Sequence, residues 1–190
     1  MTLLLHSCCG PCLTGVSPEI NDVLAFWDNP NIHPFLEYRS RLESFLKATK
    51  ILGIGHAIGS EEYGLIRFLD FLQGDYGPDR CLRCYELRLR STAEKAGELG
   101  CEAFSTTLLI SPYQKHDLII AIAGKIAKET GVSFFYRDFR PAFRIGQREA
   151  LKMELYKQKY CGCIFSEWDR YAKTSPSMGD RYKNSENTKK

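Results

Sequence analysis

Short apolar runs alternate with segments of helical periodicity along the chain, and this alternation constrains the fold more than any other feature. The strands expected from these runs span residues 3–7, 23–27, 54–58, 103–107 and 132–136. Helical spacing of apolar side chains covers residues 34–52, 65–72, 82–99 and 114–130. Strands that alternate with helices form parallel sheets, because each crossover helix returns the chain to the same end of the sheet. The sequence therefore predicts an α/β fold, with a parallel sheet flanked by helices.

The length and composition fit one such domain followed by a short extension. The chain has 190 residues, of which 44% are hydrophobic, and this is enough to bury a substantial core. We expect a single domain over residues 1–173 and a disordered tail over residues 174–190, where large apolar side chains are almost absent. No apolar run approaches the ~20 residues of a membrane span, and the first residues lack a basic leader. We therefore expect a cytoplasmic location and no membrane partner.

Seven of the eight cysteines fall into three tight clusters. The clusters are Cys8-Cys9-Gly10-Pro11-Cys12, Cys81-Leu82-Arg83-Cys84 and Cys161-Gly162-Cys163. In the reducing cytoplasm, such clusters are more typical of metal ligands or catalytic thiols than of structural disulfides. The first cluster directly follows an expected strand, and its Gly10 and Pro11 predict a turn there. Parallel α/β folds bind their ligands at the carboxyl ends of strands. We expect a functional site there, and we interpret the isolated Cys101 as a buried small apolar side chain.

Several kinds of site are compatible with these thiols. Thiolates are soft ligands that suit zinc, copper(I) and iron–sulfur clusters. A closed zinc site uses only four ligands, so seven clustered thiols favour chemistry over a purely structural zinc. Cys161 and Cys163 are separated by one residue, so they are candidates for a strained, redox-active disulfide or for ligands of a second metal. The CGPC sequence from Cys9 to Cys12 also allows a thioredoxin-like dithiol oxidoreductase.

A basic and aromatic segment lies near the end of the expected domain. Residues 137–159 carry seven Lys or Arg side chains against three acidic ones, interleaved with Phe and Tyr. RNA-binding surfaces combine cations that contact phosphates with rings that stack on bases. A solvated helix face has a similar composition, and the net charge of the chain is only +3. RNA binding and a solvated face are equally compatible with this segment, and a zinc-stabilised RNA-binding module without catalysis is one alternative for the whole chain.

The histidines are isolated along the chain. His6 lies in the first expected strand, His33 follows a turn, and His116 lies near the start of an expected helix. A single buried histidine is more often a hydrogen-bonded structural residue than a metal ligand. We therefore assign no functional role to the histidines.

Five ordered and widely separated motifs between residues 3 and 168 closely resemble the QueH family of epoxyqueuosine reductases. They are His6-Ser7-Cys8-Cys9-Gly10-Pro11-Cys12, Asn29-Pro30-Asn31-Ile32-His33-Pro34 with Glu37-Tyr38 and Arg41, Arg80-Cys81-Leu82-Arg83-Cys84-Tyr85 with Arg88-Leu89, residues 104–114, and Tyr160-Cys161-Gly162-Cys163. The family is similar in fold to the Rossmann-like adenine-nucleotide α-hydrolases. No SGGxDS-type phosphate loop follows the first expected strand, so we do not expect ATP to be used.

The resemblance implies an oxidoreductase that acts on tRNA. Its reaction would be the last step of queuosine biosynthesis, in which the epoxide of epoxyqueuosine at the wobble position of the anticodon becomes the alkene of queuosine. The resemblance further implies that Cys8, Cys9, Cys81 and Cys84 bind a [4Fe-4S] cluster, and that Cys161 and Cys163 form a redox-active disulfide. Cys12 is a further candidate metal ligand, with a purely structural role in the turn as its alternative.

The implied chemistry assigns expectations to further residues. Removing the epoxide oxygen as water takes two electrons and two protons, whereas a cluster passes one electron at a time. The second electron would be stored by Cys161 and Cys163 or by a second iron bound to a nearby thiol, and the electron donor is unidentified. Candidate proton donors are Asp75, Tyr85 and Asp138. Candidate contacts to the phosphates of the tRNA are Arg140, Arg144, Arg148 and Lys152.

Overall fold

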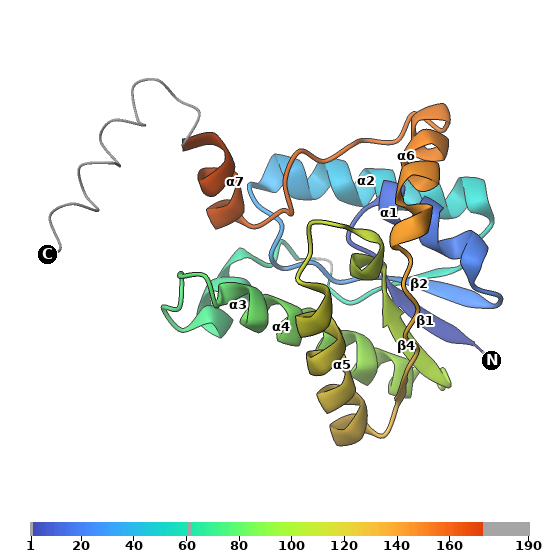
Figure 1. Cartoon of the computed structure of the whole chain (residues 1–190), viewed down its shortest axis with the longest axis horizontal. Coiled ribbons are helices and arrows are strands. Elements are labelled where there is room, and N and C mark those ends of the chain that lie inside the picture. The colour runs from blue at the N-terminus through green and yellow to red at the C-terminus, as the bar shows by residue number, and fades with distance from the viewer. Residues whose placement is uncertain (1, 61, 173–190) are drawn as a thin grey trace, which may run out of the picture.

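The computed structural model describes residues 2–60 and 62–172 and shows a five-stranded parallel sheet at the centre of the molecule (Figure 1). The strands are β1 (Leu3–His6), β2 (Val23–Trp27), β3 (His56–Ile58), β4 (Ala103–Thr106) and β5 (Ser133–Phe134). They lie in the order β3-β2-β1-β4-β5, and every neighbouring pair is parallel. This arrangement confirms the predicted α/β fold. The tail predicted over residues 174–190 lies outside the described residues.

Helices cover both faces of the sheet. They are α1 (Gly10–Val16), α2 (Phe35–Leu52), α3 (Leu65–Leu72), α4 (Arg80–Glu98), α5 (His116–Thr130), α6 (Phe143–Lys152) and α7 (Ile164–Tyr171). Figure 1 shows α1, α2 and α6 on one side of the sheet and α4 and α5 on the other, with α3 beside α4. Within the described ranges, no helix has both the length and the apolar character that crossing a membrane would require.

The central strand explains why the sheet is stable. Leu3, Leu4 and Leu5 of β1 are fully buried, because helices cover the side chains that point to either face. Next to β1, Trp27 at the end of β2 packs its ring against Phe45 and Tyr38 of α2. The core therefore fixes the carboxyl end of β1, where the first cysteine cluster begins.

The first cysteine cluster forms the start of a helix, where the sequence predicted a turn. Helix α1 begins at Gly10, and Pro11 is accepted in its first turn because the backbone N–H there needs no partner within the helix. A Cβ atom on Gly10 would lie 2.5 Å from the backbone oxygen of Ser44, so only glycine lets α1 pack this closely against α2. Cys12 therefore lies one helical turn after Cys9, on a rigid element.

The strand order identifies the edge of the sheet at which a ligand is expected. The sheet grows in one direction from β1 through β2 to β3 and in the other direction through β4 to β5. Ligands of open parallel sheets bind outside the carboxyl ends of the strands at the point where this direction changes. Cys8 follows β1 and Thr107 follows β4, and the backbone N–H of Cys8 donates to the hydroxyl oxygen of Thr107 over 3.3 Å. The first cysteines therefore lie at this switch point.

Candidate metal and redox site

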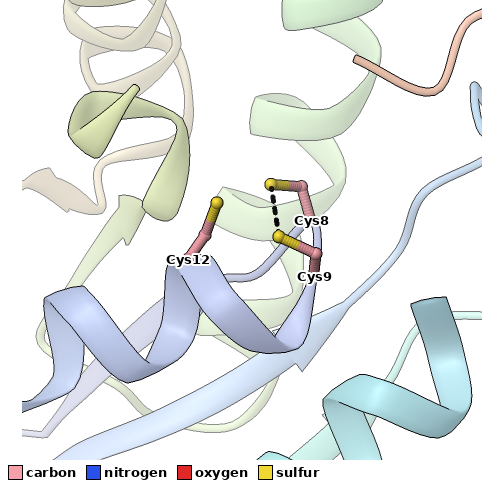
Figure 2. Close-up of side chains that lie close together, drawn as sticks. All are labelled: Cys8, Cys9 and Cys12. Atoms are coloured by element: carbon pink, nitrogen blue, oxygen red, sulfur yellow. Dashed lines mark hydrogen bonds between the residues drawn. The ribbon is translucent and has the colours of Figure 1, made fainter. Parts of the chain in front are cut away.

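Cys8, Cys9 and Cys12 form a compact group, called here the first cysteine group. Their sulfur atoms all lie within 4.8 Å of one another, and the sulfurs of Cys8 and Cys9 are 3.9 Å apart. Figure 2 shows the three sulfurs gathered on the same side of the start of α1. The side chains are 7%, 0% and 4% exposed. Such a set of converging, buried soft donors suits a thiophilic metal centre.

The surroundings of the first cysteine group favour one thiolate within it. Hydrogen bonding with the thiols of Cys12 and Cys9 holds the pKa of Cys8 well below its usual value. Burial raises the pKa of Cys9, and hydrogen bonding with Cys8 raises the pKa of Cys12. The hydroxyl of Thr107 also donates to the sulfur of Cys8 over 3.7 Å. Of the three thiols, Cys8 is therefore the one whose surroundings most favour the thiolate form.

Cys81, Cys84, Cys161 and Cys163 form the second cysteine group. They line one small cavity of about 40 Å³. Cys81 and Cys84 lie in the first turn of α4, three residues apart, so both face the same side of the helix. Cys161 and Cys163 come from the loop before α7. The structure thus brings the second and third sequence clusters together.

The loop that carries Cys161 and Cys163 is anchored by Arg41 of α2. The buried guanidinium of Arg41 donates to the carbonyl oxygens of Cys161 and Tyr160 over 3.1 and 2.9 Å. Arg41 is in turn paired with Glu37 over 2.6 Å. Gly162 has a φ of +116°, which side chains rarely tolerate, and its carbonyl accepts a hydrogen bond from the backbone of His33. The position of the two thiols therefore depends on these contacts.

All eight cysteines are free thiols in the structure. Cys161 is exposed, and its sulfur lies 2.9 Å from the hydroxyl oxygen of Ser166. Cys163 is buried, and burial raises the pKa of its thiol. One member of the pair is thus open to solvent while the other is protected. The redox-active disulfide between them stays a prediction.

Three residues near the thiols received no role from the sequence. Gln158 donates its side-chain N–H to the sulfurs of Cys9 and Cys12, over 3.1 and 3.8 Å. Arg41 anchors the loop, and Arg88 is a buried arginine that lines the cavity of the second cysteine group. Arg88 follows Cys84 by four residues, and this helical spacing in the sequence could have placed both on one face. Gln158 leaves no comparable signal, because the chain reaches it through an irregular segment.

Of the three predicted proton donors, Tyr85 alone lines the cavity. Tyr85 is buried, its hydroxyl donates to Gln114 over 2.6 Å, and burial raises its pKa so that the phenol keeps its proton. The carboxylate of Asp138 accepts a hydrogen bond from the guanidinium of Arg140 over 2.7 Å, and this pairing lowers the pKa of Asp138 to about 2. A carboxylate held in this way is a poor acid at neutral pH. Asp75 lies in the loop between α3 and α4 and does not line the cavity.

The predicted phosphate contacts lie on or beside α6. Arg144, Arg148 and Lys152 are exposed and follow one another at intervals of four residues, so they form a stripe along one helix face. The opposite face packs on α1. Lys152 is paired with Glu149 over 2.8 Å, and Arg140 with Asp138. Arg144 and Arg148 make no ion pair with any described residue, and their role in RNA binding stays a prediction.

The histidines and Cys101 have the structural character that the sequence suggested. Both ring nitrogens of the buried His6 are used, one 2.9 Å from the hydroxyl of Thr106 and the other 3.2 Å from the amide oxygen of Asn29. His33 contacts the hydroxyl of Tyr63 over 2.8 Å, and His116 contacts the hydroxyl of Tyr136 over 3.2 Å. Cys101 is buried. These residues leave the thiols as the main metal donors of the site.

The donor set and its charge fit a thiolate-bound iron–sulfur centre. The seven clustered cysteines supply more than the four soft ligands that a [4Fe-4S] cluster takes. Among the described residues, two arginines and no carboxylate line the cavity of the second cysteine group, so its walls favour an anionic occupant. The charge of the buried Arg88 acts on Cys8 in the first group and on Cys84 and Cys161 in the second. The two groups therefore belong to one electrostatic environment.

Known proteins resemble this chain over almost its whole length. The family model described as Epoxyqueuosine reductase QueH matches residues 3–169. Epoxyqueuosine reductase QueH of Dehalococcoides mccartyi is 38% identical over 175 residues, which cover 90% of this chain and 95% of that protein. The protein of the same name from Thermotoga maritima is 36% identical over 179 residues, which cover 90% of this chain and 93% of that protein. These findings confirm the predicted resemblance.

Proposed function

Because the chain belongs to the epoxyqueuosine reductase QueH family, we propose that it reduces the epoxide of epoxyqueuosine in tRNA to the alkene of queuosine. The observation that carries this proposal is the gathering of seven thiols from three distant segments into two groups, both of which act on the charge of Arg88. A site dominated by thiols suits electron transfer rather than hydrolysis. The enzyme would act in the cytoplasm, where thiols stay reduced and tRNA is available.

The cofactor of the proposed reaction is a [4Fe-4S] cluster held by Cys8 and Cys9 of the first cysteine group and by Cys81 and Cys84 of the second. When bound, such a cluster supplies electrons one at a time. The sulfur of Cys12 lies within 4.8 Å of the sulfurs of Cys8 and Cys9, so Cys12 is a further candidate ligand. The site would also bind a second iron through thiols that are not ligands of the cluster.

Cys161 and Cys163 provide the two-electron store that the reaction needs. Oxidation of these two thiols to a disulfide releases two electrons and two protons. Those electrons and protons balance the conversion of the epoxide to an alkene and one water molecule. The exposed Cys161 can meet a substrate or a reductant, while Cys163 stays buried beside Cys84 in the cavity wall. An electron donor, whose identity is open, would reduce the disulfide after each turnover.

Tyr85 is the best-placed acid for the departing oxygen. Its phenol lines the same cavity as the four thiols and stays protonated at neutral pH. The hydrogen bonds with Gln114 and with the backbone N–H of Lys115 fix the position of the phenol oxygen. In this role Tyr85 would donate a proton to the oxygen as the carbon–oxygen bond breaks.

The tRNA would approach along the stripe on α6. Arg144 and Arg148 are free to contact phosphates, whereas Arg140 and Lys152 would first have to leave their acidic partners. An anticodon loop exposes unstacked bases on a charged backbone, which suits a basic surface beside a thiol-rich cavity. The membrane has no part in this proposal.

The experiment that tests the function is turnover under anaerobic conditions. Purified protein, a chemical reductant and tRNA that carries epoxyqueuosine are incubated, and the nucleosides are then analysed by mass spectrometry. We expect queuosine to appear with the wild-type protein and with Cys101→Ser, whose thiol lies outside both cysteine groups. We expect no queuosine with Cys161→Ser/Cys163→Ser. Binding of the tRNA without conversion by the wild-type protein would instead support an RNA-binding module stabilised by zinc.

A thioredoxin-like activity of Cys9 and Cys12 finds less support in the geometry. A thioredoxin-type nucleophile is an accessible thiol with a lowered pKa. Cys9 is fully buried, and burial raises the pKa of its thiol. Replacement of Cys81 and Cys84 by serine would leave such an activity intact, whereas it would abolish the proposed reduction.

A further inference from the structure

Arg88 faces the same cavity as the second cysteine group. On α4 it follows Cys81 by seven residues, Cys84 by four and Tyr85 by three, so all four side chains share one face of the helix. These residues line the cavity together with Cys161 and Cys163. Arg88 is only 3% exposed. A guanidinium has therefore been buried against thiols at the centre of the site.

Among the described residues, Arg88 has no carboxylate partner. Its Nε donates to the carbonyl oxygen of Cys84 over 3.3 Å, and its guanidinium lies 5.9 Å from the centre of the Tyr85 ring. The other arginine of the cavity, Arg80, is paired with Asp169 over 2.5 Å. Burial of a charge is costly unless an opposite charge compensates it. The compensation for Arg88 has to come from groups other than carboxylates.

The thiols are the groups around Arg88 that can supply negative charge, because burial raises the pKa of Cys84 to about 12 and metal binding would remove its proton. Burial alone would lower the pKa of Arg88, but Cys84, Cys8 and Tyr85 act against burial, and the pKa is raised overall. Cys161 acts in the same direction. The guanidinium therefore interacts with thiols of the first and the second cysteine group. Metal binding would fix these thiols in their charged form, because only thiolates are ligands.

We propose that Arg88 is the built-in counter-ion of the thiolate-bound metal centre and raises the reduction potential of that centre. This inference rests on the proposed function, because it requires a redox-active metal centre in the site. Each electron added to the centre increases its negative charge. A fixed positive charge nearby stabilises the reduced state more than the oxidised state, so it favours reduction. Arg88 thereby tunes the centre without binding the metal or the substrate.

The test compares reduction potentials of metal-loaded variants. Wild type, Arg88→Gln, Arg88→Lys and Arg90→Gln are prepared anaerobically and titrated with reductant while the reduced centre is followed by electron paramagnetic resonance. Arg90 is the matched control, because it lies on the same helix and pairs with Glu86 and Glu129 outside the cavity. For Arg88→Gln we expect about a tenfold smaller equilibrium constant for one-electron reduction, which corresponds to a shift of about 59 mV to more negative potential. Arg88→Lys and Arg90→Gln should stay close to the wild type.

Each outcome of this test has a definite meaning. An unchanged potential in Arg88→Gln, or an equal shift in Arg88→Lys, would overturn the charge-based role of Arg88. If Arg88→Gln holds no metal while Arg88→Lys does, the positive charge is required for assembly of the centre, and the proposal stands only if Arg88→Lys also has the reduction potential of the wild type. If Arg88→Lys also holds no metal, the proposal fails. A wild-type protein that binds no redox-active metal would instead overturn the proposed function.

Discussion

The first cysteine group and the loop over residues 160–163 present their thiols in opposite ways. Cys8, Cys9 and Cys12 are buried at the junction of β1 and α1, where the sheet and helix packing fix their backbone. Cys161 is exposed on an irregular loop whose position depends on the side chain of Arg41. Rigid buried thiols suit permanent ligands, whereas an accessible thiol suits exchange of electrons with changing partners.

This difference divides the proposed reaction between two regions. The first cysteine group would belong to the metal centre, and the loop would carry the thiol pair that is oxidised and reduced in each turnover. Arg88 links the two regions electrostatically, because its charge acts on Cys8 and on Cys161. Substitutions that separate metal content, loop position and tRNA binding can therefore test the division.

Removal of a buried thiol should have the largest effect. We expect Cys8→Ser to reduce bound iron and epoxide reduction to background, because a proposed ligand at the switch point of the sheet is lost. Cys101→Ser is the control, since this thiol is also buried but lies outside both cysteine groups. The measurement is the iron content per chain of both variants. Full iron content in Cys8→Ser would remove Cys8 from the ligand set.

Loss of the loop anchor should have a large effect on stability but not abolish metal binding. Arg41→Met leaves the partly buried carboxylate of Glu37 without its cation, and we expect the free energy of unfolding to fall by about 3 kcal/mol. The loop should also loosen, so alkylation of Cys161 should become faster.

Arg39→Met is the matched control for the loop anchor. Arg39 lies on the same helix and pairs with Glu43 in an exposed i,i+4 contact of 3.8 Å. Its loss should cost less than about 0.5 kcal/mol in urea unfolding. Equal effects of the two substitutions would show that Arg41 has no special role in the loop.

Acid should destabilise the surroundings of both thiol regions, because a buried neutral histidine lies beside each. His6 lies just before the first cysteine group, and the backbone N–H of His33 donates to Gly162 of the loop. Burial lowers the pKa of His6 and of His33 to about 4 from an ordinary 6.5. Between these values the unfolded chain binds more protons than the folded chain. Each histidine therefore contributes its full stabilisation above pH 6.5. As the pH decreases below 6.5, the free energy of unfolding falls by up to ~1.4 kcal/mol per pH unit for each histidine. In His33→Gln, the loss of unfolding free energy between pH 7 and pH 5.5 should shrink by about 1 kcal/mol. The same loss in both proteins would contradict a neutral buried His33.

Substitutions in the basic stripe on α6 should have the smallest effect, and they should change tRNA binding alone. We expect Arg144→Ala/Arg148→Ala to weaken tRNA binding several-fold at moderate salt and to reduce the logarithmic salt slope by about two. Lys125→Ala is the control, since this exposed lysine lies on α5 on the other side of the sheet. Unchanged affinity and salt slope in the double variant would place the RNA surface elsewhere.

The sequence predicts the sheet better than the helices near the end of the chain. Residues 3–5 and 23–27 are continuous apolar runs, which suit strands of a parallel sheet that is buried on both faces. Helix α1 was missed because Gly10 and Pro11 are turn residues unless the proline occupies a first helical turn. Helices α6 and α7 are short, with ten and eight residues, and the segment of α6 is rich in charged side chains, so the sequence left it open as an RNA-binding surface or a solvated helix face.

The sequence likewise predicts some features of the candidate site and misses others. Cysteine spacing and family resemblance were enough to predict that the three clusters are functional, and the structure brings Cys81 and Cys84 together with Cys161 and Cys163. Spacing could not predict that Arg41 holds the loop from 120 residues away. Nor could it distinguish Tyr85, which lines the cavity, from Asp138, which is held by Arg140.

The metal content of protein isolated without oxygen tests the central claim most directly. Iron, sulfide and zinc are measured in the same preparation, together with its absorption spectrum before and after reduction. We expect a brown protein with about four iron atoms per chain, or more if the second iron is retained, and a spectrum that bleaches on reduction. A colourless protein that holds one zinc ion per chain would contradict the iron–sulfur centre.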